Sequence, residues 1–157
     1  METRVNLFDN AITAKFAKRL MNVGQVVAQS SLPKATQELV KIRASQINGC
    51  GFCTDMHTKD AAAAGETSVR LNLIAAWREA TVFTEAERAA LALAEEGTRI
   101  ADAHTGVSDQ TWEQVRKHYD DEQIGALICL VAEINTWNRL NAIARTPAGS
   151  YEPGMFA

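Results

Sequence analysis

Apolar residues recur at intervals of three and four along most of this chain, and apolar and polar residues nowhere alternate long enough to predict a β-strand. The first such stretch predicts a helix from about Asp9 to Gln29. Its apolar stripe consists of Ala11, Ile12, Phe16, Leu20, Val23 and Val27. After a break, Pro33 suits the first turn of a second helix, which we expect to end near Asn48 and Gly49. The inward positions of this second helix are Leu39, Ile42 and Ile47.

Capping residues and a glycine mark the ends of the remaining predicted helices. The third helix begins around Cys50 and stops at Gly65, which suits a left-handed C-terminal cap. Thr84 with Glu87 three residues later has the form of a capping box. The later helices run from Ser68 to about Trp77, from Thr84 through Ala94, from Ser108 past Val115, and from Asp120-Asp121 through Leu140. We therefore predict an all-α helical bundle, followed by an extended tail (residues 147–157) that lies on a neighbouring subunit.

Length and composition place these helices in one domain spanning residues 1–157. The 26 alanines agree with closely packed helices, and a net charge of −3 argues against nucleic acid as a partner. The longest unbroken apolar run, Ala126 to Ala132, is far shorter than the roughly 20 residues that cross a bilayer, so no membrane partner is expected. The N-terminus lacks the pattern of a signal peptide and the number of cysteines is odd. We therefore expect a cytoplasmic protein without a disulfide framework.

Two of the three cysteines, Cys50 and Cys53, are separated by two residues at the start of the third predicted helix. The first amides of a helix lack intrahelical acceptors and the helix dipole is positive there, so this position favours a thiolate over a thiol. The spacing also lets both sulfurs join in a disulfide within one turn. One thiolate can attack while the other resolves, which indicates two-electron redox chemistry. Cys129 lies inside the longest apolar run and is expected to be a core residue.

His57 adds a second signal because it lies four residues beyond Cys53, on the same face of the helix. An imidazole there can take the thiol proton or stabilise the thiolate. Cys50 is seven residues from His57 and is served less directly. The spacing therefore nominates Cys53 as the attacking sulfur and Cys50 as the resolving one. In thioredoxin-type sites the N-terminal cysteine attacks, and this precedent keeps the opposite order open.

Two plainer interpretations of the cysteine pair remain. Cys50, Cys53 and His57 would be three of the four ligands of a structural zinc site, but the sequence offers no second pair of ligands to complete it. Alternatively, both thiols are buried and inert. His104 and His118 are isolated in the sequence, and we expect them to be ordinary surface or boundary residues.

A spaced pattern of polar residues surrounds the pair and can be written E-x4-R-x-S-x2-N-x-C-x2-C-x3-H. It consists of Glu38, Arg43, Ser45, Asn48, Cys50, Cys53 and His57. The pattern resembles the core of the AhpD-like alkylhydroperoxidases in the carboxymuconolactone decarboxylase-like superfamily. Ile134-Asn135-Thr136-Trp137-Asn138-Arg139 is also similar to a motif in the last helix of many members. The resemblance is close over residues 34–83, the expected redox core, and looser over residues 122–145.

The resemblance implies an all-helical protein that assembles into homo-trimers or homo-hexamers and reduces small organic hydroperoxides without a metal or cofactor. In that scheme Glu38 orients or polarises His57, if need be through water. His57 then helps to deprotonate Cys53, which attacks the peroxide. The resulting sulfenic acid condenses with Cys50 to a disulfide, which stops further oxidation. A thiol electron donor, such as a lipoylated or thioredoxin-like protein, then reduces that disulfide.

The sequence departs from part of this family at Phe52, because some members carry a histidine between the two cysteines. Phe52 would instead cover the dithiol and give it an apolar approach that suits organic peroxides. Arg43 and Asn48 are expected to pair or cap near the helix junction. Two other functions stay open. One is a cofactor-independent carboxymuconolactone decarboxylase, which does not need the dithiol. The other is a redox-sensing or structural helical oligomer whose dithiol only switches.

Overall fold

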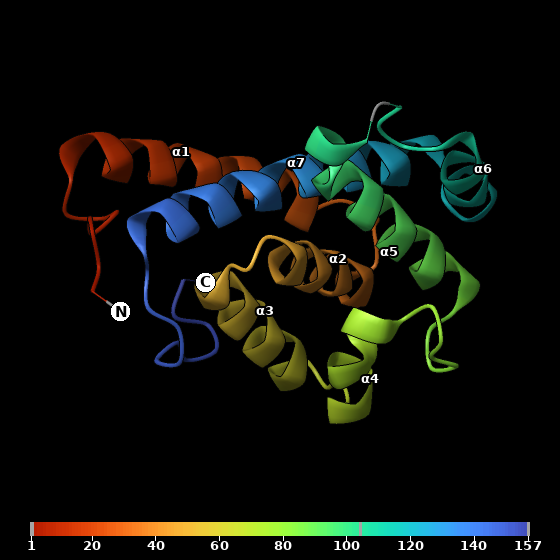
Figure 1. Ribbon diagram of the computed structural model, residues 1–157, viewed down its shortest axis with the longest axis horizontal. Helices are drawn as coiled ribbons and strands as arrows, with labels where there is room; N and C mark the ends of the chain where they lie inside the picture. The colour runs from red at the N-terminus through yellow and green to blue at the C-terminus, as the bar shows by residue number, and fades with distance from the viewer. Residues whose placement is uncertain (1, 104, 157) are drawn as a thin grey trace.

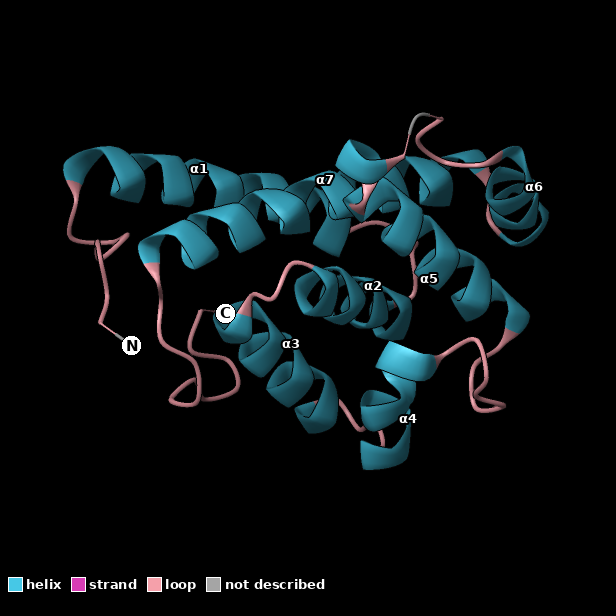
Figure 2. Ribbon diagram, viewed as in Figure 1, coloured by secondary structure: helices cyan, strands magenta, loops and turns pink. Residues whose placement is uncertain are grey.

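The protein is all-helical in the computed structural model, which describes residues 2–103 and 105–156. The helices are α1 (Ala11–Ala28), α2 (Lys34–Ile47), α3 (Gly51–Ala63), α4 (Ser68–Leu73), α5 (Glu85–Thr98), α6 (Asp109–His118) and α7 (Asp121–Ala144), with short 3₁₀ turns η1 (Ile74–Ala76) and η2 (Ile100–Asp102). Figure 2 shows these helices joined by loops, and the described residues contain no β-strand. The predicted all-α fold is confirmed.

Local sequence sets several of the helix ends. Thr84 and Glu87 form the predicted capping box, since the Thr84 hydroxyl accepts the N–H of Glu87 at 3.2 Å and the Glu87 carboxylate accepts the N–H of Thr84 at 2.8 Å. Asp120 and Gln123 make the same exchange before α7. Gly65 follows α3 with φ +97°, a left-handed conformation that glycine adopts without a steric cost. These ends were predictable because each depends on residues within one turn.

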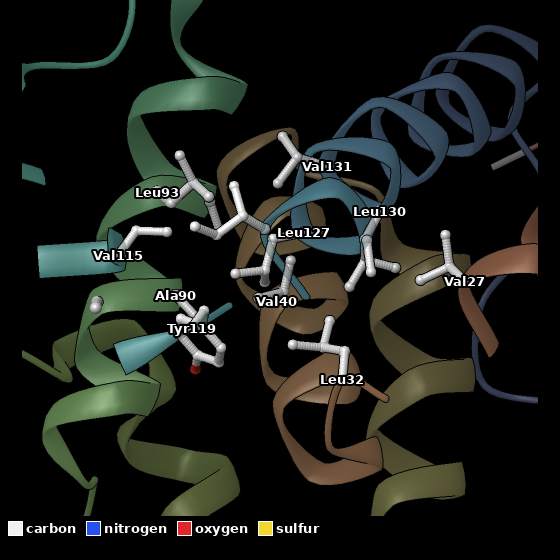
Figure 3. Packing of buried hydrophobic residues seen from close by; sticks show 14 residues of the cluster. Val27, Leu32, Val40, Ala90, Leu93, Val115, Tyr119, Leu127, Leu130 and Val131 are labelled. Carbon is white, nitrogen blue, oxygen red and sulfur yellow. The ribbon is translucent and has the colours of Figure 1, made fainter. Parts of the chain in front are cut away.

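Helix α2 lies at the centre of the packing and contacts α3, α5 and α7. Figure 1 shows α1 running alongside α7, with α2 and α3 adjacent below them. The main core forms where α2, α5, α6 and α7 meet, and Figure 3 shows Val40 and Leu127 within it. Among the predicted inward residues, Leu39 and Ile42 are buried whereas Ile47 is only half-buried. With α2 fixed by this core, its polar residues are held in a defined place against α3.

Leu127 has none of its surface exposed and lies among the largest buried side chains of this core. We expect Leu127→Ala to lower the free energy of unfolding by about 2–5 kcal/mol, because it removes buried apolar surface and leaves a cavity. Urea unfolding followed by circular dichroism measures this loss. Ile128→Ala is the matched control, since Ile128 is the next residue on α7 and is 52% exposed; its effect should stay below about 0.5 kcal/mol. Equal losses in the two variants would contradict the burial of Leu127 in this core.

The predicted apolar stripe of α1 mostly faces outward. Val27 is buried, but Ile12 is 80% exposed and Phe16 and Val23 are about half exposed. Helix α1 buries Ala17 as well, and the periodicity alone did not tell which positions would meet α7. The exposed apolar side chains of α1 are a surface that the expected homo-trimer or homo-hexamer would bury. The oligomeric state stays a prediction. Within the described residues, no helix has both the length and the hydropathy to cross a membrane.

The C-terminal residues 147–156 overturn one expectation. They fold back onto α3 of the same chain, whereas from the sequence we expect them to lie on a neighbouring subunit. The Gly149 N–H donates to the Asp55 carboxylate at 2.7 Å, and the Tyr151 hydroxyl donates to the Asp60 carboxylate at 2.9 Å. The expectation was wrong because the partners of the tail are ordinary helix carboxylates, and nothing in their spacing distinguishes them from solvated ones.

Candidate active site

Cys50 and Cys53 lie at the first turn of α3. Cys50 precedes the helix with an extended backbone (φ −81°, ψ 96°), and its Sγ accepts the N–H of Cys53 at 3.4 Å. A sulfur thus occupies the capping position that a serine or aspartate oxygen usually takes. The positive end of the helix dipole favours negative charge on the Cys50 sulfur.

The two sulfurs are 2.8 Å apart, and both residues are almost wholly buried. The hydrogen bond from the Cys53 thiol lowers the pKa of Cys50; burial opposes this effect, and the Cys53 N–H and Asn138 reinforce it. The same hydrogen bond, together with burial and the negative charge on Cys50, raises the pKa of Cys53. The pair therefore ionises first at Cys50 and keeps its remaining proton on Cys53.

A cavity of about 270 Å³ adjoins one of the two sulfur-bearing residues. Cys53 and His57 line it, and Cys50 does not. Much of its wall is apolar and comes from helices and from both ends of the chain, including Leu7, Phe8, Phe52, Met56, Trp137 and Phe156. A small apolar molecule in this cavity would therefore meet Cys53 and not Cys50. The lining position of Phe52 agrees with the apolar approach expected from the sequence.

His57 follows Cys53 by one helical turn and is held by Glu38 from α2, with 2.9 Å between His57 Nδ1 and Glu38 Oε2. The other oxygen of Glu38 accepts a hydrogen bond from Lys41 at 2.9 Å. Burial by itself raises the pKa of Glu38, but the hydrogen bonds and charges of His57 and Lys41 outweigh it and lower the pKa to about 2. Glu38 is therefore an anion at neutral pH. It fixes the imidazole so that Nε2 is the nitrogen left for another partner.

The imidazole of His57 and the Cys53 thiol line the same cavity but are not joined by a hydrogen bond. Across residues 2–103 and 105–156, no hydrogen bond joins His57 to the sulfur of Cys50 or of Cys53. Both Cys53 and His57 line the same cavity. A proton that moves between them would therefore pass through a water molecule or a bound ligand in that space.

Asparagines on one face of α7 tie the dithiol to the last helix. Asn48, at the end of α2, donates to the side-chain oxygens of Asn135 and Asn138, both at 2.9 Å. Asn141 donates to the Sγ of Cys53 at 3.5 Å. The motif in the last helix pointed to this region, but sequence reasoning missed Asn141 as a neighbour of the sulfur. The spacing of three residues between successive asparagines in a largely apolar helix was the available signal.

Arg43 forms an ion pair, as expected from the sequence. Its Nε donates to Glu95 Oε1 at 2.6 Å, and Glu95 is buried on α5. Glu95 also accepts the indole N–H of Trp77 at 3.0 Å and a hydrogen bond from Arg78. These contacts join α2, the η1 region and α5, and none of these four residues lines the cavity beside Cys53.

Glu133 on α7 and Lys41 on α2 also line the cavity, and sequence reasoning missed both. The Glu133 carboxylate lies against Gly24 of α1, where a Cβ would collide with its Oε1 and displace it. Burial raises the pKa of Glu133, and Lys41 and His57 counter it only in part. No periodicity singles out Glu133, because its position depends on how α1 and α7 pack together.

Cys129 is exposed, so the expectation of a core residue is wrong. An apolar run of seven residues covers nearly two helical turns and all faces of the helix, and on α7 Ile128 also faces outward while Leu130 is buried. His118 is half-buried at the end of α6, and His104 lies outside the described residues. As for the zinc alternative, the described part of the chain contains no group of three His, Cys, Asp or Glu side chains placed to hold a metal ion.

The fold is helical, and it holds a buried pair of cysteines beside a histidine and a cavity. Comparison with known protein families shows which family has this arrangement. The model of the Carboxymuconolactone decarboxylase family matches residues 14–96. The chain belongs to this family, and its relatives place it in the AhpD-like part of the superfamily. The resemblance inferred from the spaced motif is thereby confirmed.

Two relatives in sequence carry this assignment. The uncharacterized protein YdfG of Bacillus subtilis is 40% identical over 150 residues, which are 96% of this chain and 99% of YdfG. Alkyl hydroperoxide reductase AhpD of Rhodopseudomonas palustris is 39% identical over 99 residues, which are 59% of this chain and 52% of that protein. The similarity to YdfG therefore extends over almost the whole chain. The similarity to AhpD covers 59% of this chain and about half of the AhpD protein.

Solved structures agree with the sequence comparison. A protein of unknown function from Agrobacterium tumefaciens, described as a candidate antioxidant defence protein AhpD, has a TM-score of 0.88 and 37% identity and covers 96% of this chain and 100% of its own. The debrominase Bmp8 has a TM-score of 0.76 and 17% identity, over 87% of this chain and 73% of its own. At 17% identity the likeness to Bmp8 is one of fold.

Proposed function

We propose that this protein is a thiol-dependent peroxidase that reduces organic hydroperoxides with Cys53 and Cys50. The observation that carries the proposal is a pair of buried sulfurs 2.8 Å apart, of which only Cys53 lines an apolar cavity that it shares with His57. A relative named alkyl hydroperoxide reductase AhpD supports the same chemistry. Two thiols at this distance can together supply the two electrons that cleavage of a peroxide bond requires.

In the first step, the Cys53 thiol passes its proton to the Cys50 thiolate, with which it already shares a hydrogen bond. The Cys53 thiolate then attacks the terminal oxygen of a hydroperoxide in the cavity. The O–O bond breaks with its electron pair on the alkoxide, and Cys53 becomes a sulfenic acid. The alkoxide takes one proton and leaves as the alcohol. His57 supplies that proton through the cavity, and Glu38 holds the ring in place for it.

In the second step, the sulfur of Cys50 attacks the sulfur of the Cys53 sulfenic acid. The S–O bond breaks, the hydroxide takes the Cys50 proton and leaves as water, and a disulfide forms. The cycle closes when a dithiol donor reduces this disulfide by thiol–disulfide exchange, and a lipoylated or thioredoxin-like protein is the class of donor we expect. No step in this scheme requires a metal ion or an organic cofactor.

Turnover of cumene hydroperoxide by the wild-type protein, with dithiothreitol as reductant, tests the proposed function. We expect catalytic turnover with the reductant. Without it, we expect consumption of one equivalent of peroxide and the loss of two hydrogen atoms from the intact mass. A reversible disulfide without peroxide consumption would favour the redox-sensing alternative. Decarboxylation of carboxymuconolactone that survives replacement of both cysteines would favour the decarboxylase, and either result would overturn the peroxidase.

A further inference from the structure

The C-terminal tail is anchored along α3, the helix that carries the dithiol. Asp55 accepts the N–H of Gly149 at 2.7 Å, and the ammonium group of Lys59 donates to the carbonyls of Gly149 at 3.1 Å and Tyr151 at 2.8 Å. The Tyr151 hydroxyl donates to Asp60 at 2.9 Å, and Tyr151 is only 3% exposed. The tail therefore has a defined position along α3, and Figure 1 shows the C-terminal segment in blue beside this helix.

From this position the tail approaches the two residues between the cysteines, Gly51 and Phe52. A Cβ on Gly51 would lie 3.3 Å from the Cβ of Ala148, so the tail backbone passes close to this glycine. The Phe156 ring meets the Phe52 ring edge-on, with 6.4 Å between their centroids. It also stacks on Tyr151 at 5.9 Å, which links the anchored part of the tail to its end. The tail therefore contacts the turn of α3 that carries the two cysteines.

Phe156 also joins the two ends of the chain at the cavity. Its ring stacks on Phe8 of the N-terminal segment, with 5.9 Å between centroids and 20° between ring planes. Phe8, Phe52 and Phe156 all line the cavity that contains Cys53 and His57. Phe8 and Phe156 keep 50% and 41% of their surface exposed, so they lie where the cavity meets solvent. We call these three phenylalanines the aromatic mouth.

We propose that Phe156 is a specificity-determining residue of this site, and that the aromatic mouth selects hydroperoxides that carry an aromatic ring over small ones. This inference rests on the proposed peroxidase function. Aromatic rings prefer neighbours at centroid distances of about 4.5–7 Å in stacked or edge-on arrangements, and the mouth presents rings in both arrangements. The cavity of about 270 Å³ exceeds the roughly 150 Å³ that holds benzene, so one substituted ring fits beside Cys53.

The test compares Phe156→Ala and Phe156→Leu with Met155→Ala as the matched control. Met155 precedes Phe156 in the tail, is 55% exposed and does not line the cavity. For Phe156→Ala we expect kcat/KM for cumene hydroperoxide to fall about tenfold, mainly through KM, while kcat/KM for hydrogen peroxide stays within about twofold. For cumene hydroperoxide, kcat/KM of Phe156→Leu should lie between the values of the wild type and Phe156→Ala. With both peroxides, kcat/KM of Met155→Ala should equal that of the wild type. An unchanged ratio of the two substrates in Phe156→Ala would overturn the inference.

Binding of cumyl alcohol, the unreactive product, separates this inference from the proposed function. Isothermal titration calorimetry with the wild-type protein and Phe156→Ala should show about tenfold weaker binding to the variant. If the wild type turned over no peroxide, the proposed function would fail, and a loss of cumyl alcohol binding in Phe156→Ala would still support the aromatic mouth. Equal binding to the two proteins, or an equal loss in Met155→Ala, would contradict the mouth even if peroxide turnover were normal.

Discussion

Replacing Cys53 by serine is expected to lower hydroperoxide turnover by about a thousandfold or more, because a serine hydroxyl does not ionise near neutral pH and cannot take up the peroxide oxygen as a sulfenic acid. Cys53 is the cysteine of the pair that lines the cavity, and Asn141 donates a hydrogen bond to its Sγ at 3.5 Å. Steady-state consumption of cumene hydroperoxide with dithiothreitol measures the loss. Cys129→Ser is the matched control, since Cys129 is exposed on α7, and its turnover should equal that of the wild type.

Cys50→Ser distinguishes attack from resolution. Without a reductant, this variant should consume one equivalent of peroxide and then stop, with a sulfenic acid on Cys53 that dimedone traps and mass spectrometry locates. Its rate of peroxide consumption should also be lower, because the Cys50 thiolate no longer stands ready to take the proton of Cys53. The opposite pattern, with activity retained in Cys53→Ser and a trapped sulfenic acid on Cys50, would reverse the assigned order. That result would match the thioredoxin-type precedent.

Replacing Glu38 by glutamine is expected to change both activity and acid stability. The variant keeps a side chain of similar size beside His57 but loses the negative charge that holds the imidazole and pairs with Lys41. Turnover should fall by roughly a hundredfold at neutral pH, because His57 loses the carboxylate that fixes the orientation of its ring for proton transfer. Glu79→Gln is the control, since Glu79 is an exposed carboxylate away from the cavity, and its turnover should not change.

The stability effect of Glu38 has a definite sign with pH. Its pKa falls from 4.5 to about 2 in the folded protein, which corresponds to about 3 kcal/mol of stabilisation. Because the folded pKa is the lower one, this stabilisation is complete above about pH 4.5 and is lost as the pH falls toward 2. Urea unfolding of the wild type and Glu38→Gln should therefore differ most at neutral pH and converge near pH 2. A constant difference across this range would show that the charge of Glu38 does not stabilise the fold.

Much of the fold was predictable because it depends on residues close in sequence. The capping boxes at Thr84 and Asp120 are exchanges between residues three apart, and they form wherever the helix forms. His57 shares a helix face with Cys53 because it lies four residues further along α3. The placement of the dithiol at a helix start followed in the same way. The spaced motif then identified the family, which local patterns alone did not.

The errors came from features that periodicity does not encode. Cys129 and most of the α1 stripe are apolar positions that face outward, because an apolar pattern does not say which face another helix will cover. The tail was assigned to a neighbouring subunit, but Asp55 and Asp60 hold it on its own α3. Local pattern could not tell these carboxylates from the solvated ones on other helices.

By itself, the sequence determined the helices, their caps, the turn that carries the two sulfurs and the histidine one turn later, since backbone hydrogen bonds within a few residues decide all of these. Apart from the pairing of Glu38 with His57, which the family resemblance implied, only the tertiary structure decided which distant groups meet them. The contact of Glu38 with His57 spans 19 residues, and that of Asn141 with Cys53 spans 88. Both contacts, the cavity and the position of Phe156 at its mouth depend on how α1, α2, α3 and α7 pack together. That packing buries apolar surface from segments far apart in the sequence, and no short segment contains it.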